Sequence, residues 1–422
     1  MVSPRVLIVA EHASARFGGE AFLPLHYFRL LRKRGVEAFL LCHSRVRAEL
    51  CATFPSEISR LYFIEDRPVQ RLLWKAGGRL PTSFAAAITG PLIYMVTQRA
   101  ARGIARRIVR DQRIDVVHQP IPVSPKLPSA MWDLGAPVII GPMNGGMTYP
   151  PGFVDRQSGG ERYMVAAARA AANLANRVIP GKRRAALLLV ANRRTRDALP
   201  VRAPVEEMVE NGVDMERFIR AAGPARSGPP RFAFVGRLIP LKAVDILIEA
   251  FARARPVRPM LLDIFGDGPE RGSLDQLASK LGLTQAIRFH GFVPQAELPA
   301  RLAPCDALVL PSLRECGGAV VLEAMALGLP VIATRWGGPE DYIDEECGIL
   351  IEPRTPEQLT HDLMETMVRL AQDEDLRLRL GAAGRRKVER EFDWEKKLDR
   401  MLQVYNRVMV GAQGPTNSQA AV

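Results

Sequence analysis

Two glutamates and a pair of glycines stand where they can bind a sugar and a phosphate. Glu315 falls in an expected loop, and Glu323 lies about a turn and a half into the helix expected after it. One carboxylate can then reach a sugar while the other accepts hydrogen bonds from ribose hydroxyls. Gly317-Gly318 lets the backbone approach a ligand where the helix begins, so that amide N–H groups face a phosphate. Helix glutamates are usually solvated, but Glu323 interrupts an apolar run in which an unpaired carboxylate is costly.

Two basic residues follow a strand-like run in the same half of the chain. Arg237 and Lys242 come after Phe232–Val235, so both are expected at the carboxyl end of that strand. Cations fixed there would stabilise the negative charge that grows on a leaving group, without help from a metal. No D-x-D motif, HxxxH motif or Cys/His cluster of the chain suggests a bound metal. We therefore expect neither a bound metal nor a cofactor.

Alternating strand and helix patterns supply the framework for these residues. In both halves, short apolar runs alternate with helical segments, which is typical of a parallel sheet covered on both faces. The expected C-terminal strands are Phe232–Val235, Leu261–Phe265, Ile287–His290, Ala307–Leu310, Val331–Ala333 and Ile349–Ile351, with helices at Leu241–Arg255, Glu270–Leu281, Glu297–Ala303 and Val320–Leu327. The expected N-terminal strands are Val6–Ala10, Ala38–Leu41, Leu61–Ile64, Val116–His118, Val138–Gly141 and Leu187–Val190, with helices at Phe22–Lys33 and Arg99–Arg110.

This order of elements predicts an α/β protein with two Rossmann-like doubly wound domains that face a cleft. We assign residues 1–210 to the first domain and 211–390 to the second. Residues 391–410 are expected to form a terminal helix, and 411–422 a loose tail. The Pro- and Gly-rich stretch Gly223–Pro230 marks the hinge region.

Length and composition agree with a folded, two-domain protein. A chain of 422 residues is too long for one ordinary core, and 47% hydrophobic with 24% charged residues excludes gross disorder and a polytopic membrane protein. Five widely spaced cysteines indicate neither a disulfide framework nor a thiolate metal site. The apolar run Val6–Ala10 is too short for the core of a leader peptide, so we expect a cytoplasmic protein.

Most of the positive charge lies in the N-terminal half. Residues 1–212 hold 31 Lys and Arg against 16 Asp and Glu, whereas the rest holds 27 against 29. An anionic membrane surface, a phosphorylated acceptor, nucleic acid or a merely solvated basic face would each account for this imbalance. On a helix, Arg99, Arg102, Arg106, Arg110 and Arg113 form one basic stripe after the apolar stretch Phe84–Val96. The interpretation we favour is peripheral contact with the inner face of the cell membrane.

Taken together, the motifs resemble those of the retaining GT-B glycosyltransferases of family 4, also called group 1. The resemblance rests on the Glu315/Glu323 pair, with Phe234–Leu238 and Lys242 before it and Gly328–Thr334 after it. Further matching motifs are Gly18-Gly19, Asn211–Asp214, Gly266–Glu270, His290-Gly291, Gly337-Gly338, Gly348–Leu350 and Phe392–Trp394. The resemblance covers nearly the whole chain. It also implies that the helix at 391–410 crosses back to the first domain.

The resemblance implies an enzyme that moves a hexosyl-type sugar from a nucleotide-diphosphate donor to an acceptor hydroxyl with retention of configuration. The implied setting is glycan or exopolysaccharide assembly, with a glycan or lipid-linked acceptor and no nucleic-acid partner. The implied catalytic residues are Glu315, Arg237 and Lys242, which address the sugar and the diphosphate, and His118, which contacts the transferred sugar. The implied donor-binding residues are Gly18, Gly19, Gly236, Gly266, Gly317, Gly318 and Glu323. Glu20 and Asn144 are assigned to the acceptor side.

Three other functions fit parts of the sequence. A sugar-nucleotide epimerase of similar architecture would release nucleotide without an acceptor. A nucleic-acid binder would use the basic half and show salt-sensitive binding without turnover. A dehydrogenase would use the glycines of Gly266-Asp267-Gly268, but such a short pattern is weak and no suitably placed acidic residue follows it.

Overall fold

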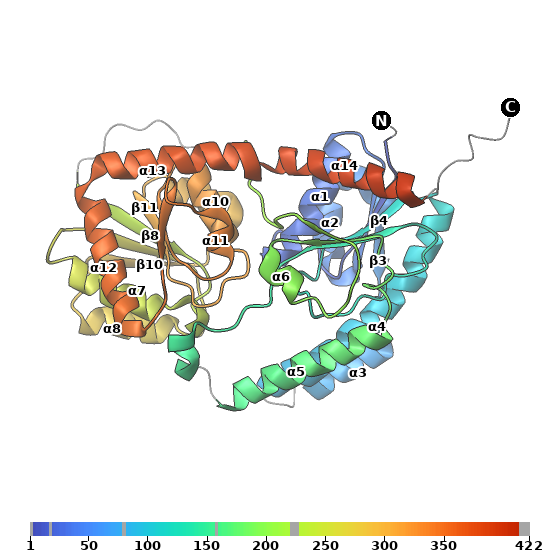
Figure 1. The fold of residues 1–422 in the computed structure, drawn as a ribbon, viewed down its shortest axis with the longest axis horizontal. Coiled ribbons are helices and arrows are strands. Elements are labelled where there is room, and N and C mark those ends of the chain that lie inside the picture. The colour runs from blue at the N-terminus through green and yellow to red at the C-terminus, as the bar shows by residue number, and fades with distance from the viewer. Residues whose placement is uncertain (1–2, 17–18, 78–81, 157–158, 220–227, 413–422) are drawn as a thin grey trace. The chain divides into compact units, whose positions relative to one another are not determined.

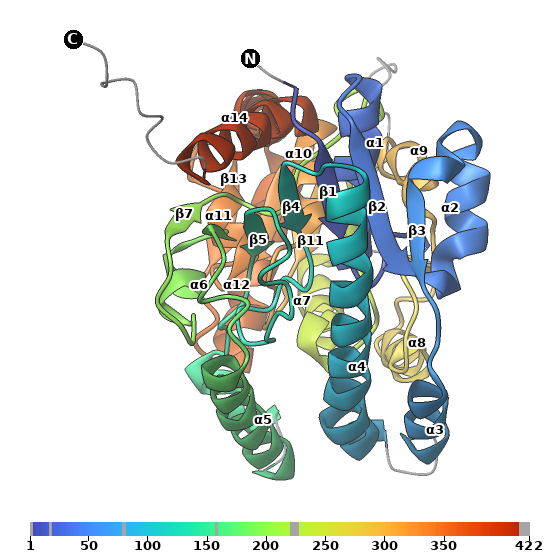
Figure 2. The same ribbon diagram turned by 90° about the vertical axis from the view of Figure 1, so that its right-hand side faces the viewer.

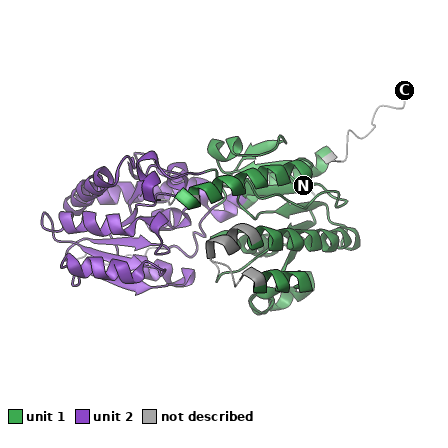
Figure 3. Cartoon of the chain, turned by 90° about the horizontal axis from the view of Figure 1, so that it is seen from below, with its two compact units in different colours: residues 1–146, 159–210, 398–422 green, residues 147–158, 211–397 purple. Residues whose placement is uncertain are grey.

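The computed structural model describes the chain except for residues 1–2, 17–18, 78–81, 157–158, 220–227 and 413–422 (Figure 1). The predicted site residue Gly18, most of the predicted hinge and most of the predicted tail therefore lie outside the described residues. The chain forms two compact units, coloured separately in Figure 3, and each is described here by itself. Unit 1 comprises Met1–Gly146, Gly159–Glu210 and Leu398–Val422, and unit 2 comprises Met147–Ser158 and Asn211–Lys397.

Unit 1 is built on a seven-stranded parallel sheet with the order β3-β2-β1-β4-β5-β6-β7. Its central strands are buried on both faces, as expected of apolar runs covered by helices. The strands are β1 Val6–Val9, β2 Ala38–His43, β3 Leu61–Ile64, β4 Val116–Gln119, β5 Val138–Met143, β6 Leu187–Val190 and β7 Val205–Glu207. The edge strand β7 was not predicted. It is short and only partly buried, so it lacks a strong apolar run.

Helices flank the strands of unit 1 or project away from them (Figure 2). They are α1 Phe22–Lys33, α2 Arg47–Thr53, α3 Pro68–Gly77, α4 Thr82–Asp111, α5 Gly159–Val178 and α6 Arg193–Asp197. The predicted helix Arg99–Arg110 is the second part of α4, which is 30 residues long and contains Pro91. Small and branched side chains of α4, such as Ala105 and Ile108, belong to the same buried core as Leu7 and Val117 of the strands.

Unit 2 contains a six-stranded parallel sheet with the order β10-β9-β8-β11-β12-β13. The strands are β8 Arg231–Val235, β9 Leu261–Phe265, β10 Ile287–Gly291, β11 Ala307–Leu310, β12 Val331–Thr334 and β13 Gly348–Ile351. The helices are α7 Val244–Ala254, α8 Arg271–Lys280, α9 Leu298–Leu302, α10 Ala319–Ala326, α11 Gly338–Tyr342, α12 Pro356–Gln372 and α13 Glu374–Lys387. The predicted α/β class with two doubly wound sheets is confirmed.

The strand order of each sheet reverses direction at one place. In unit 2 the chain moves outward from β8 through β9 to β10, and then from β11 on the other side of β8 to β13. The loops after β8 and β11 therefore diverge, and ligands of open α/β sheets bind at such switch points. These two loops still touch, because the Leu313 N–H donates to Leu241 O at 2.9 Å. In unit 1 the corresponding point lies between β1 and β4.

The chain passes between the two units more than once. The structure groups Met147–Ser158 with unit 2, although our sequence analysis placed these residues in the first domain. Hydrogen bonds within unit 2 explain the difference: Trp336 Nε1 donates to Thr148 O at 2.9 Å, and Arg156 pairs with Asp245 at 2.8 Å. Helix α14, Trp394–Ala412, begins in unit 2 and is grouped with unit 1 from Leu398 onward.

None of the helices in the described part of the chain combines the length and the apolar character that crossing a membrane requires.

Candidate active site

An ion pair joins the two loops at the switch point of unit 2. Lys242 ends the short 3₁₀ helix Pro240–Lys242 after β8, and its Nζ pairs with Glu315 Oε2 in the loop after β11. Both side chains are mostly buried. The buried Ser312 hydroxyl donates to the same Glu315 oxygen at 3.3 Å. Glu315 Oε1 makes no hydrogen bond to the described residues, so it is the oxygen that remains for a ligand hydroxyl.

Arg237 is the second cation of this region. It lies just beyond the end of β8 and is exposed. Its guanidinium has no hydrogen bond or ion pair with any residue that the structure describes. The site therefore holds one cation that a carboxylate neutralises and one that is open to an anion.

Glycines allow the loops of the site to pack closely. A Cβ at Gly266, whose φ is +142°, would lie 1.8 Å from the carbonyl oxygen of Gly236. A Cβ at Gly236 would in turn lie 3.1 Å from Cζ of Phe234. The loops after β8 and β9 are in backbone contact, because the Gly236 N–H also donates to Phe265 O at 3.0 Å. This is a steric reason for both predicted glycines, whatever they bind.

The glycine pair before α10 has a similar steric role. Gly318 adopts φ 73° and ψ 55°, a left-handed conformation, and caps the helix. A Cβ there would lie 3.0 Å from Glu315 Cγ. The N–H groups of the first helical turn have no partner within a helix, and they carry its positive dipole end. Gly317-Gly318 therefore leaves the amide end of α10 beside Glu315, as an anion seat requires.

The loop after β12 holds Glu315 from the other side. The Gly338 N–H donates to Glu315 O at 2.8 Å, and Glu315 forms an isolated bridge with Gly337. A Cβ at Gly338 would lie 2.2 Å from Gly317 O. In the sequence, Gly337-Gly338 stands out only as part of the resemblance. In the structure this glycine pair fixes the backbone of the predicted catalytic loop.

Glu323 is buried within α10, with 6% of its surface exposed. Burial raises its pKa to about 7, and a hydrogen bond from Gln295 Nε2 to Oε1 acts in the opposite direction. Gln295 lies in the short helix Gln295–Glu297 that follows β10. The sequence analysis missed Gln295, although its place after the carboxyl end of a predicted strand was a usable signal.

We expect Glu323→Gln to reduce the pH dependence of stability. The folded pKa of Glu323 lies above the ordinary glutamate value of 4.5, so the favourable contribution of the buried carboxyl to stability is present below pH 4.5 and is lost as pH rises through about 7. Between these two pH values the contribution of Glu323 to the free energy of unfolding changes by at most about 3 kcal/mol. The free energy of unfolding of Glu323→Gln, relative to the parent, should therefore rise between pH 5 and pH 8 in urea titrations. A difference that stays constant with pH, or an equal change for the exposed control Glu249→Gln, would contradict this.

His118 lies on β4 inside unit 1. Its side chain is completely buried, with Nε2 2.7 Å from Gly141 O and Nδ1 2.7 Å from the Tyr405 hydroxyl. Nε2 must donate to the carbonyl, so Nδ1 accepts from the tyrosine. The ring also packs edge-on against Tyr27 at 4.8 Å between centroids. These contacts hold the ring in place, and the predicted contact of His118 with the transferred sugar stays a prediction.

Asn144 is also an internal residue of unit 1. It is 1% exposed, and its Nδ2 donates to both carboxylate oxygens of Glu210 at 3.0 and 3.1 Å. The predicted acceptor contact of Asn144 stays a prediction. Glu20 is exposed, and its Oε2 accepts from the Val123 N–H at 3.4 Å. Gly19 has φ +47° with open space around it. Roles for Glu20 and Gly19 remain predictions.

The arginine stripe is only partly as predicted. Arg99, Arg106 and Arg110 are exposed on α4, whereas Arg113 lies beyond its end. Arg102 is held by Trp132: its guanidinium lies 3.9 Å from the ring centroid, and its Nε donates to the backbone oxygen at 3.0 Å.

The apolar stretch before the stripe is partly internal. Tyr94 is buried, and its hydroxyl donates to Pro128 O at 2.8 Å. The expectation that Phe84–Val96 faces a membrane is therefore wrong at Tyr94. The side chain of Phe84 lies outside the described residues.

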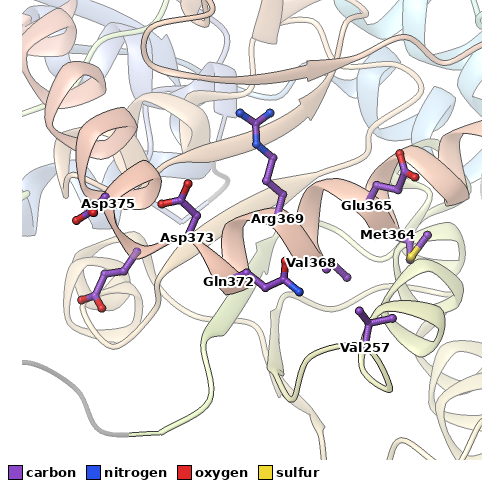
Figure 4. Close-up of a pocket in the computed structure, with 9 residues that line it drawn as sticks. Val257, Met364, Glu365, Val368, Arg369, Gln372, Asp373 and Asp375 are labelled. Carbon is purple, nitrogen blue, oxygen red and sulfur yellow. The ribbon is translucent and has the colours of Figure 1, made fainter.

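A surface hollow of about 910 Å³ lies between α12, α13 and the end of α7 (Figure 4). Its lining contains one cation, Arg369, and four carboxylates, which makes it unsuited to a diphosphate. His361, Asp362 and Glu365 on α12 lie close enough to hold a metal ion, but exposed groups of this kind are common without one. Neither the lining of the hollow nor this cluster on α12 includes a predicted site residue.

Comparison with known proteins agrees with this geometry. Residues 215–387 match the model of the family described as glycosyl transferases, group 1. Over these residues the chain is similar to group 1 glycosyltransferases. The matched segment holds Arg237, Lys242, Glu315 and Glu323, so the predicted family is confirmed where the ion pair lies. One curated relative is a D-inositol 3-phosphate glycosyltransferase of Salinispora arenicola, 36% identical over 55% of this chain and 57% of its own length. The chain thus spans little more than half of such relatives.

Solved structures of similar fold cover nearly the whole chain. Sucrose-phosphate synthase from Thermosynechococcus elongatus superposes with a TM-score of 0.67 at 18% identity, covering 96% of this chain and 99% of the other. HepE of Anabaena, solved with UDP and glucose, gives a TM-score of 0.64 at 16% identity, covering 96% and 100%. At such identities the similarity concerns the fold, and it confirms the predicted GT-B class.

Proposed function

We propose that the chain is a glycosyltransferase whose unit 2 binds a nucleotide-diphosphate sugar. The observation that carries the proposal is the Lys242–Glu315 pair at the switch point, with the exposed Arg237 just beyond the end of β8. It lies within residues that match group 1 glycosyltransferases. A structural neighbour that binds UDP and glucose supports a donor of this class.

Each group of the site has a proposed role. Arg237 and Lys242 bind the diphosphate, and the amide end of α10 at Gly317-Gly318 binds a phosphate oxygen. Glu323 accepts hydrogen bonds from the ribose, displacing the amide of Gln295. Glu315 directs Oε1 to a hydroxyl of the transferred sugar, while its other oxygen positions Lys242.

The proposed reaction retains the anomeric configuration. The acceptor hydroxyl attacks the anomeric carbon on the face from which the diphosphate departs, and the bond between that carbon and the phosphate oxygen breaks. The departing oxygen takes the acceptor proton, and the electron pair of the broken bond leaves with the diphosphate. The protein contributes positioning and charge stabilisation rather than a nucleophile. The proposed acceptor is a glycan or a lipid-linked glycan in polysaccharide assembly at the cytoplasmic side of a membrane.

Release of nucleotide from UDP-, GDP- and ADP-sugars tests the proposal. The full chain is incubated with each donor and with acceptors that include inositol phosphate and lipid-linked sugars, and the product is analysed by NMR for its anomeric configuration. Acceptor-dependent release with a retained anomer is expected. Release without any acceptor would indicate an epimerase instead, and an inverted anomer would refute the mechanism.

We expect EDTA to leave transfer nearly unchanged. The positive charges of Arg237 and Lys242 and the amides of α10 supply the stabilisation that a divalent ion provides in other enzymes. Initial rates with and without chelator, and after addition of Mg²⁺ or Mn²⁺, give the measurement. Complete loss of rate that either metal restores would contradict the expectation.

A further inference from the structure

Exposed apolar side chains gather on three helices of unit 1. Trp74 on α3 is 70% exposed and Tyr163 on α5 is 76% exposed. Figure 2 shows α3, α4 and α5 projecting to the same side of the unit. We call their exposed apolar residues the α3/α5 surface, and its members are Val69, Leu72, Trp74, Leu92, Tyr163, Leu174 and Val178. Large apolar side chains left exposed on helices that project to one side indicate an interaction site.

Helix α5 has its apolar side facing outward. Six exposed residues recur at the three- and four-residue spacing of one helix face, namely Tyr163, Ala167, Ala170, Ala171, Leu174 and Val178. The opposite face holds α5 in place with polar side chains. Asn176 Nδ2 donates to Lys126 O at 2.7 Å, and Lys126 Nζ donates to Asn173 Oδ1 at 3.1 Å. A surface helix of a soluble protein normally has the reverse arrangement.

Helix α3 is arranged in the same way. Its contact with α4 includes the buried Gln70, whose Nε2 donates to the Thr97 hydroxyl at 2.7 Å. Leu72 and Trp74 remain exposed, and Arg71 and Lys75 are exposed beside them. Apolar and basic side chains therefore share the outward part of this helix.

We propose that the α3/α5 surface binds the face of an anionic lipid bilayer. Five basic residues and one acidic residue lie on the two helices, namely Arg71, Lys75, Arg162, Arg169 and Arg177 against Glu161. Helices with apolar side chains beside basic ones lie in the interface of anionic membranes, where Trp and Tyr bury their rings and keep their polar atoms hydrated. A second copy of the chain fits less well, because a symmetric dimer would bring like charges together. The proposal does not rest on sugar transfer, since binding needs no donor.

Cosedimentation of the full chain with vesicles tests the proposal. Vesicles of phosphatidylcholine with phosphatidylglycerol should bind the chain, and vesicles of phosphatidylcholine alone should not. The double variant Arg71→Gln, Lys75→Gln should bind about 30-fold more weakly, since each basic residue near an anionic leaflet contributes about fivefold. Leu72→Ser with Trp74→Ser should weaken binding by roughly tenfold or more. The control Leu378→Ser removes a similarly exposed leucine from unit 2 and should change nothing.

Tryptophan fluorescence gives a second measurement at the proposed contact. Brominated phosphatidylglycerol in the vesicles should quench the tryptophan fluorescence of the chain, and Trp74→Phe should remove most of that quenching. The proposal is overturned if neutral vesicles bind equally well, if the α3 variants bind as the parent does, or if Trp74→Phe leaves the quenching unchanged. It is also overturned if the chain forms a dimer in solution that Leu72→Ser with Trp74→Ser abolishes.

Discussion

Replacing Glu315 by glutamine is expected to reduce sugar transfer by roughly 10²- to 10³-fold, the range seen when one preorganised electrostatic contact of a transition state is lost. Glu315 Oε2 pairs with Lys242 and accepts from Ser312. An amide keeps the shape of the carboxylate but removes its charge. Lys242 would then lose its partner, and the group proposed to address the sugar would lose its strength as an acceptor.

The fold should tolerate this substitution. Glu315 lies in a loop whose backbone is held by the Gly338 N–H, and glutamine leaves that contact intact. Circular dichroism and the unfolding midpoint of Glu315→Gln should therefore match those of the parent, with Glu249→Gln as a matched control on the surface of α7. Undiminished turnover in the folded variant would refute the proposed role of Glu315.

Replacing Arg237 by alanine is expected to lower transfer by about 10²-fold or more with no loss of stability. The side chain is exposed and has no partner among the described residues, so its removal strands no other group. Any loss of activity in Arg237→Ala can then be attributed to a lost contact with the ligand. Arg237→Lys should fall between the parent and Arg237→Ala, because lysine keeps the charge but not the paired N–H groups that match a phosphate. Equal turnover for Arg237→Ala and the parent would contradict this role.

Lys242→Ala is expected to lower transfer to a similar extent, but for two combined reasons. It removes a cation and leaves the mostly buried carboxylate of Glu315 unpaired. Because the two side chains act together, the double variant Lys242→Ala, Glu315→Gln should lose less than the product of the single losses. Strictly multiplicative losses would show that the two residues act independently.

Several elements of unit 2 were predictable because their burial leaves a clear local pattern. The expected strands Leu261–Phe265 and Ala307–Leu310 coincide with β9 and β11. Both are apolar runs whose side chains are buried almost throughout. Helix α5 of unit 1 was missed for the opposite reason. Its apolar residues face outward and its inward face is polar, so it carries no signal of packing against a core.

The candidate site was predictable as a set of residues but not as contacts. Lys242 and Glu315 are 73 positions apart, and only the order β8-β11 brings their loops together. The internal contacts of His118 and Asn144 were not predictable for a related reason. His118 is covered in part by Tyr405, which lies 287 positions further along the chain, and no local pattern reveals that contact. Residues that follow the carboxyl ends of predicted strands could be recognised from the sequence. The burial of a residue by a segment far along the chain could not.

Thermal unfolding of the full chain with UDP, GDP and ADP tests most directly the claim that unit 2 binds a nucleoside diphosphate. At least one of these ligands should stabilise the parent, by about 2.7 kcal/mol when its concentration is 100 times Kd. That stabilisation should disappear in Arg237→Ala and persist in Arg258→Ala, which removes another exposed arginine of unit 2. The account is contradicted if none of the three diphosphates stabilises the parent, or if Arg237→Ala is stabilised as strongly as the parent.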